Sequence, residues 1–159
     1  MQALYVTEHG GPESLVLGER PVPQIRGDEV LVKVRAAGMN HLDAWVRRGV
    51  EGHVFPLPMT LGSDGAGEVV EVGELVDGVA AGDRVALSPG SGPRRTEESL
   101  AGLHHLNHRY DILGETRDGT CAEFVAVPAE SLLAMPEGMS FEDAAAIPLA
   151  ALTAHHMVA

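Results

Sequence analysis

Alternation of apolar and polar residues is the most regular pattern along the chain, and it is clearest in the sequence EVLVKVRAAG. There Val30, Val32 and Val34 recur at every second position. The positions between them hold Leu31, Lys33 and Arg35. A period of two is typical of a strand with one buried face, so we predict a strand here. Further strands are predicted in QALYV, LVLGE, GEVVEVG, RVALSPG, TCAEFVAVPA and SLLAMP.

Glycine- and proline-rich turns separate these strands, and the first two flank HGGPES, which predicts a hairpin. The chain lacks the regular strand–helix alternation of a parallel sheet, so the pattern favours a mainly β Greek-key barrel. A short helix is predicted from His41 to Gly49. A second helical stretch begins at Ser140, and Pro148 should divide it. We therefore expect a β domain at residues 1–139 and a helical connection at residues 140–159.

Two clusters of polar residues interrupt this scaffold. The first cluster, Asn40, His41 and Asp43, follows a predicted strand, and the second, Ser63 and Asp64, stands between glycines before GEVVEVG. Polar side chains are costly to bury unless they bond to one another. We therefore expect the two clusters to form one site.

The glycines beside the second cluster could be taken for a dinucleotide-binding fingerprint. That fingerprint requires a strand before it and a helix after it. Here a proline-containing loop precedes Gly62, and the strand pattern EVVEV follows Gly67. The nucleotide-binding interpretation of this segment is therefore rejected.

Composition narrows the classes of function. The 159 residues are enough for one domain, and their 23 acidic and 11 basic side chains give a net charge of -12 at pH 7. This charge argues against a nucleic acid or an anionic membrane as partner. No apolar run approaches the roughly 18 residues of a membrane span, and no leader pattern is present, so we expect a cytoplasmic protein. The single cysteine, Cys121, excludes an intramolecular disulfide.

The order AAGMNHLDAW, LGSDGAGEVVEVG and GDRVAL resembles the N-terminal, GroES-like domain of the medium-chain dehydrogenase/reductase superfamily. The resemblance extends over the whole chain, from MQALYV to ALTAHHMVA. It implies hydride transfer with NADP or NAD, held mainly by a Rossmann domain that these residues do not include. It also implies little activity without that domain and a homo-oligomer at full length.

In zinc-dependent members of the superfamily a Cys stands at the position of Asn40, and a His-Glu pair stands at Ser63 and Asp64. Catalytic zinc requires about three thiolate, imidazole or carboxylate ligands, and this set does not supply them. The substitutions resemble the zinc-independent quinone oxidoreductases, which implies a quinone, enone or related carbonyl substrate and no zinc. A zinc-type alcohol dehydrogenase domain and a stand-alone binding module without catalysis are the alternatives.

The resemblance assigns roles to the first cluster. Asn40 would lie beside the nicotinamide and polarise the acceptor oxygen, although an Asn at a strand end also bonds its own backbone. His41 would contact the cofactor pyrophosphate or donate a proton, unless it is merely an exposed residue at a helix start. Asp43 would support the site from behind, with Ser63 as its partner.

Three further assignments depend on the same resemblance. Ser63 and Asp64 complete the catalytic set, although both also favour turns. Thr153 would lie near the nicotinamide carboxamide. Trp45 and Val46 would form the pocket wall, although packing of a helix face explains them equally well.

The segment 91–119, termed the lobe, is long for a loop. Zinc-dependent relatives carry four cysteines in the corresponding segment. Their positions are occupied here by Pro93, Thr96, Ser99 and Asn107. Thr96 followed by two glutamates predicts a short helix in place of metal. His104 and His108 would share a helix face and could bind metal, but no third ligand is evident.

Overall fold

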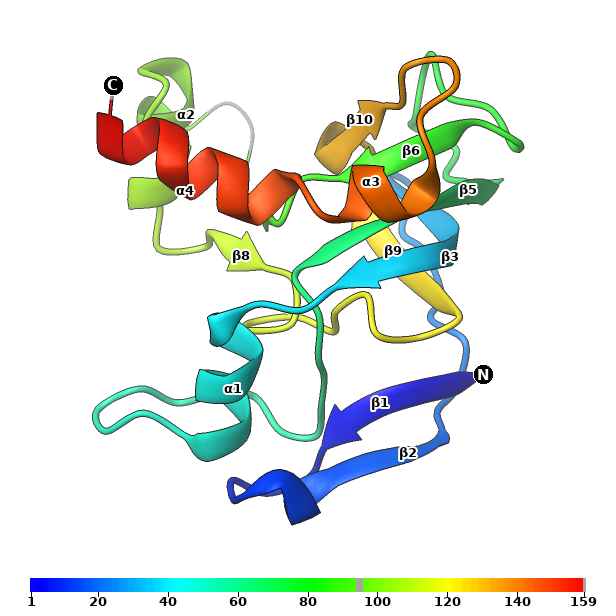
Figure 1. Cartoon of the computed structure of the whole chain (residues 1–159). Helices are drawn as coiled ribbons and strands as arrows, with labels where there is room; N and C mark the ends of the chain where they lie inside the picture. The colour runs from blue at the N-terminus through cyan, green and yellow to red at the C-terminus, as the bar shows by residue number, and fades with distance from the viewer. Residues whose placement is uncertain (94–95, 159) are drawn as a thin grey trace.

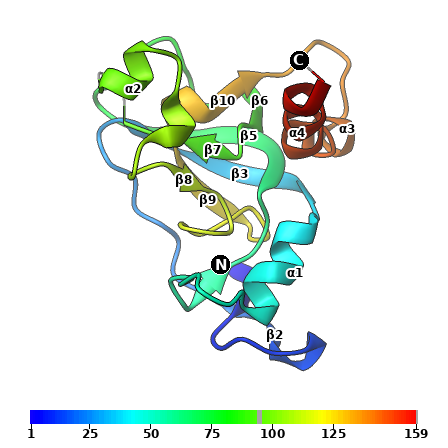
Figure 2. The same ribbon diagram turned by 90° about the vertical axis from the view of Figure 1, so that its left-hand side faces the viewer.

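The computed structural model describes residues 1–93 and 96–158, which form a mainly β architecture (Figures 1 and 2). A five-stranded sheet in the order β10-β6-β5-β3-β9 forms its centre. Its strands are β3 (Glu29–Gly38), β5 (Asp64–Val72), β6 (Arg84–Leu87), β9 (Phe124–Pro128) and β10 (Leu132–Ala134). Every pairing between strands of the described residues is antiparallel, as the sequence predicts.

A second sheet, in the order β2-β1-β4, lies beside α1 at the end of the molecule that holds the N-terminus (Figure 1). It contains β1 (Gln2–Val6), β2 (Leu15–Glu19) and β4 (Met59–Thr60), with the 3₁₀ turn η1 (Pro12–Ser14) in the predicted hairpin. A third sheet pairs β7 (Gly90–Ser91) with β8 (Asp111–Ile112) in the lobe.

The helices are short and lie where the sequence predicts them. They are α1 (His41–Arg48), α2 (Glu97–Leu100), α3 (Phe141–Ala145) and α4 (Pro148–Val158), with 3₁₀ turns η2 (His104–Leu106) and η3 (Ala129–Ser131). The Ser140 hydroxyl caps α3 by accepting from the Asp143 amide at 3.0 Å. The predicted break is confirmed, because α4 begins at Pro148. No described helix combines the length and the apolar character needed to cross a bilayer.

Valines of β3, β5, β6 and β9 build the main core. In β3 the alternation is incomplete, because Leu31 is buried together with Val30 and Val32, so the first half of this strand is covered on both faces. A smaller core beneath α1 contains Val46, Phe55 and Met59. Packing in this core therefore fixes the position of α1, which carries the first polar cluster.

Alanines form the third core, where α3 lies against the central sheet. The approach is close, since a Cβ at Gly38 would lie 2.6 Å from the carbonyl oxygen of Ala145 and 3.0 Å from the Cβ of Asp64. This contact brings the start of α4 next to the second polar cluster.

Candidate functional site

Asp43 joins the two polar clusters. Its Oδ2 accepts a hydrogen bond from the Asn40 backbone amide at 2.7 Å, across the first turn of α1. Its Oδ1 accepts from the Gly62 amide, also at 2.7 Å. Since Asp43 is 2% exposed, both bonds are made inside the protein. The clusters form one site, as expected, but the predicted Asp43–Ser63 contact is wrong because backbone amides are the partners of Asp43.

Asp64 connects three separate parts of the chain. Its Oδ2 accepts from Nδ2 of Asn40 at 2.9 Å, and its Oδ1 accepts from the backbone amide of Leu149 at 2.8 Å. Its own carbonyl oxygen accepts from the Thr120 hydroxyl at 2.6 Å. Asp64 is therefore more than a turn residue: it ties the site to the first turn of α4.

The side chain of Asn40 reaches across to Asp64 with its nitrogen, and it also belongs to the capping box of α1, where it faces the Asp43 amide. A primary amide carries two N–H donors and one acceptor oxygen. The bond to Asp64 uses one donor and fixes the plane of the amide. The second N–H group can therefore interact with a bound molecule.

The Ser63 hydroxyl is fully buried, and among the described residues it has no hydrogen-bond partner. An orphaned buried polar group costs roughly 1–3 kcal/mol. The site thus contains a hydroxyl whose hydrogen-bonding capacity the surrounding protein does not use.

Burial dominates the electrostatics of the site. It raises the pKa of Asp43 above its ordinary value, and the nearby charge of Asp64 adds to this, although the two amide hydrogen bonds oppose it. Burial, with the charge of Asp43, also raises the pKa of Cys121 to about 11. Cys121 is therefore a thiol at neutral pH. It lies just before β9 and packs against the core beneath α1.

The remaining predicted residues lie outside this network. His41 and Thr153 are both exposed, the first at the start of α1 and the second in α4. Trp45 is 52% exposed, whereas Val46 is completely buried in the core beneath α1. The structure thus brings together Asn40, Asp43, Ser63 and Asp64.

Two members of the network were not predicted, namely Thr120 and the backbone amide of Leu149. Thr120 is fully buried beside the glycines of the second cluster. A Cβ at Gly62 would lie 2.5 Å from the Thr120 hydroxyl, and a Cβ at Gly65 would lie 2.7 Å from its methyl group. These glycines therefore leave room for Thr120. Their presence beside the second cluster is the only feature of the sequence that indicates a close neighbour there.

The arrangement does not fit a zinc ion bound by three protein ligands. Both carboxylate oxygens of Asp64 are engaged by N–H donors, and Asn40 presents to Asp64 an amide nitrogen whose lone pair is delocalised into its carbonyl group and does not bind metal. Across residues 1–93 and 96–158, no group of three or more His, Cys, Asp or Glu side chains is placed to hold a metal. The chemistry of the donors present is that of a hydrogen-bonding site.

The lobe likewise has hydrogen bonds at Thr96, Ser99 and Asn107, three of the positions that correspond to the cysteines of zinc-dependent relatives. Thr96 Oγ1 accepts from the Ser99 amide at 3.2 Å and from Asn107 Nδ2 at 3.4 Å, which confirms the predicted helix start. Asn107 Nδ2 also lies 3.1 Å from Oε2 of Glu98. His104 and His108 do not share a helix face, because η2 ends at Leu106.

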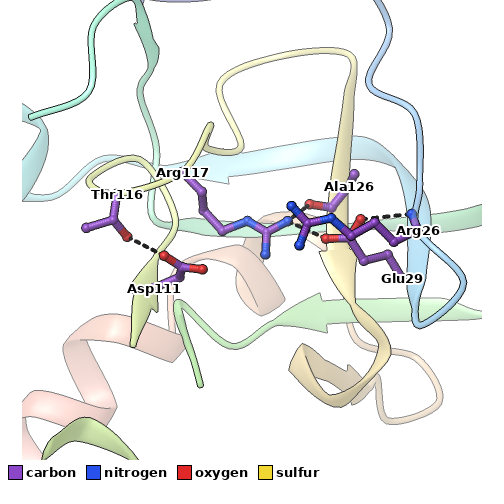
Figure 3. Close-up of polar contacts among 6 residues, drawn as sticks. All are labelled: Arg26, Glu29, Asp111, Thr116, Arg117 and Ala126. Carbon is purple, nitrogen blue, oxygen red and sulfur yellow. Dashed lines mark hydrogen bonds and ion pairs between the residues drawn. The ribbon is translucent and has the colours of Figure 1, made fainter. Parts of the chain in front are cut away.

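A cavity of about 590 Å³ lies elsewhere, at the opposite end of β3 from Asn40, and no predicted catalytic residue lines it. Inside it Arg117 Nη2 donates to Glu29 Oε1 and to the Ala126 carbonyl, each at 2.8 Å (Figure 3). Burial would raise the pKa of Glu29, but the bonds from Arg117 and from the Arg26 amide hold it below its ordinary value. This ion pair links β3, β9 and the lobe, and we interpret it as structural.

Comparison with known proteins places the chain in a family. Residues 26–137 match the alcohol dehydrogenase GroES-like domain. The chain belongs to this family, and with it to the medium-chain dehydrogenase/reductase superfamily. The expected GroES-like fold is thereby confirmed.

Several relatives of the chain are dehydrogenases. The chain is 34% identical to an NAD-dependent alcohol dehydrogenase of Sulfurisphaera tokodaii, over 99% of this chain and 47% of the relative. It is 36% identical to a zinc-type alcohol dehydrogenase-like protein of Schizosaccharomyces pombe, over 92% of this chain and 41% of the relative.

Solved structures of alcohol dehydrogenases are also similar to the chain. A crystal structure of an NAD-dependent alcohol dehydrogenase is 49% identical, with a TM-score of 0.94 over 99% of this chain and 46% of the other. A cobalt- and zinc-bound alcohol dehydrogenase from Pyrobaculum aerophilum is 33% identical, with a TM-score of 0.89 over 99% of this chain and 47% of the other. The chain thus spans less than half the length of these proteins.

Proposed function

We propose that this chain is the catalytic-domain portion of an NAD(P)-dependent oxidoreductase that interconverts a carbonyl compound and its alcohol without zinc. The observation that carries the proposal is the Asn40 amide, held by the buried carboxylate of Asp64 with one N–H still able to donate. The alcohol dehydrogenase relatives support this substrate class over the quinone substrates that the sequence motifs favour.

In this proposal Asn40 acts on the oxygen of the substrate. Its second N–H donates a hydrogen bond to the carbonyl oxygen and stabilises the negative charge that develops there during hydride transfer. Asp64 holds the amide in place, and Asp43 fixes the backbone of Asn40. Preorganised donors of this kind stabilise the transition state by about 2.7–4 kcal/mol.

The buried Ser63 hydroxyl supplies a second contact. Because it is fully buried and has no partner among the described residues, a bound water can bond to it without breaking an existing bond and link it to the substrate. The exposed residues His41 and Thr153 are the proposed contacts for the cofactor pyrophosphate and the nicotinamide carboxamide.

The cofactor supplies a hydride, and the chain supplies position and polarisation. We expect little activity from the 159 residues alone, because the orientation of the hydride donor depends on a nucleotide-binding domain.

The test is reduction of aldehydes and ketones by NADH and NADPH, measured on the full-length protein that contains this chain, before and after chelation. We expect chelation to leave turnover unchanged, and Asn40→Ala to lower kcat/KM by about 100-fold or more, the effect of removing one preorganised donor. Stoichiometric zinc that is required for turnover would contradict the metal-free proposal.

Quinone or enone reduction is the second candidate. Leu42 stands where zinc-dependent relatives carry a hydroxyl for proton relay, and it packs against the core beneath α1. A pocket without that relay suits acceptors whose reduction does not require it. Faster turnover of quinones or enones than of aldehydes and ketones would favour this candidate.

A further inference from the structure

The carboxylate of Asp64 is shared between the proposed catalytic amide and the helix that leaves the β domain. One oxygen accepts from Asn40 Nδ2 at 2.9 Å and the other from the Leu149 amide at 2.8 Å. Since Asp64 is 2% exposed, water does not compete freely for either oxygen. A rotation of this carboxylate must therefore alter both bonds together.

Helix α4 has few other attachments to the domain. Pro148 is buried and Leu149 is half-buried, but every described residue from Ala150 onward is exposed. Figure 1 shows α4 running from α3 toward the lobe, where the ring of His156 lies 6.3 Å from that of His105. The first turn of α4 is thus its main anchor, and Asp64 accepts from that turn.

Electrostatic attraction strengthens the contact between the first turn of α4 and the Asp64 carboxylate. The first turn of a helix presents unsatisfied N–H groups and a partial positive charge, which together favour a carboxylate. Helix α3, by contrast, is fixed by close packing, since its Ala145 carbonyl lies against Gly38. Motion of α4 relative to the domain therefore acts on Asp64 before it acts on α3.

We propose that Asp64 is a positioning residue that transmits the direction of helix α4 to the Asn40 amide. When the Leu149–Asp64 bond is made, the carboxylate holds Asn40 with one N–H aimed at Asp64 and one available. When α4 changes direction or unwinds at its start, the Leu149–Asp64 bond is lost. The carboxylate then rotates, and the plane of the Asn40 amide is no longer fixed. The inference relies on the proposed function only for the importance of Asn40, because the coupling itself is a property of the hydrogen bonds.

The test uses the 159-residue chain and the side-chain amide signals of its two asparagines, Asn40 and Asn107, in nuclear magnetic resonance spectra. Helix α4 is loosened by the double substitution Ala151→Gly and Ala154→Gly, at two exposed positions away from the site. Each glycine weakens a helix by about 1 kcal/mol relative to alanine. The matched control is Glu97→Gly, which loosens the exposed helix α2.

We expect the double glycine variant to shift the Asn40 signals and leave those of Asn107 in place. Glu97→Gly should leave the Asn40 signals in place. In an Asp64→Asn background the glycines should no longer move the Asn40 signals, because the connection between helix and amide has been removed. That loss separates transmission through Asp64 from a general loosening of the domain.

Asn40 signals that stay fixed when α4 is loosened would overturn the inference, as would an equal shift in the Asp64→Asn background. No substrate or cofactor is present in these measurements. A failure of the coupling is therefore distinguishable from a failure of the proposed reaction, which turnover by the full-length protein tests separately.

Discussion

The site and the lobe correspond to the two places where zinc-dependent relatives hold metal, and in this chain both are organised by hydrogen bonds. At the site, two carboxylates that are each 2% exposed accept from backbone and side-chain amide N–H groups, and the Ser63 hydroxyl has no described partner. In the lobe, the hydroxyls of Thr96 and Ser99 each accept from a backbone amide, and the side-chain amide of Asn107 donates to Thr96 and Glu98.

The difference lies in what each network costs. Buried carboxylates and an orphaned hydroxyl destabilise a fold, so a protein that needed only packing would do better without them. The lobe contains hydrogen bonds that cap the short helix α2 and leave no buried group without a partner at Thr96. We infer that the lobe network supports structure alone, whereas the site network sacrifices stability for a binding surface.

Removing the Asp43 carboxylate tests the buried network most severely. Asp43→Ala leaves the Asn40 and Gly62 amides without their acceptor, and we expect a loss of about 3 kcal/mol of unfolding free energy. Chemical denaturation measures the change. The control is Asp83→Ala, which removes an exposed carboxylate that accepts from the Ala80 amide at 2.8 Å and should cost far less. Equal losses would show that burial adds nothing at Asp43.

The pH dependence of stability should have opposite signs in the two regions. The folded pKa of Asp43 lies above the ordinary 3.8, so the folded state binds the extra proton, and stability falls as pH rises from 3.8 to the folded pKa. The limiting slope is about 1.4 kcal/mol per pH unit. Denaturation of the wild type and of Asp43→Asn from about pH 3.5, near the ordinary carboxyl pKa, to about pH 7 measures the contribution of Asp43 to the unfolding free energy.

Glu98 in the lobe supplies the opposing case. Its pKa lies below the ordinary 4.5, because its own backbone amide and then the Thr96 and Asn107 side chains donate to it. Its contribution is present above pH 4.5 and is lost as pH falls through the folded pKa. The same titration on Glu98→Gln should therefore reveal a term that rises with pH, and a falling term would contradict the assignment.

Thr96→Ala tests the lobe directly. The substitution removes the cap of α2 and the acceptor for Asn107, and we expect a loss of about 1.5 kcal/mol. The side-chain signals of Asn107 should shift while those of Asn40 stay in place. Thr96→Ser retains the hydroxyl and should restore most of the stability. A shift at Asn40 would mean that the two networks are coupled.

The sequence predicts much of this fold because its signals are local. Val30, Val32 and Val34 mark β3 by their spacing, and Ser140 and Pro148 mark the boundaries of α3 and α4. The capping of α1 by Asp43 is equally local, since the two residues it joins are three positions apart. Such contacts follow from residue type and spacing along the chain.

The rest of the site depends on long-range placement. The bond between Asp64 and Leu149 spans 85 residues and uses a backbone donor, which residue type does not reveal. The position of Thr120 over two glycines arises from the approach of distant segments. The expectation that Ser63 pairs with Asp43 was wrong for the same reason, because two backbone amides, those of Asn40 and Gly62, are the donors to this carboxylate.

Ser63→Ala is the smallest change and separates stability from function at the site. Removing a buried hydroxyl that has no described partner should stabilise the fold by about 1 kcal/mol. In the full-length protein the same substitution should lower kcat/KM, because the water-mediated contact between this hydroxyl and the substrate is lost. Thr60→Val, which removes a buried hydroxyl that accepts from Arg20 Nη1 at 2.8 Å, is the control and should not stabilise the fold. If Ser63→Ala destabilised the protein, the hydroxyl would already have a hydrogen-bond partner in the absence of a ligand, and the proposed role in ligand binding would be wrong.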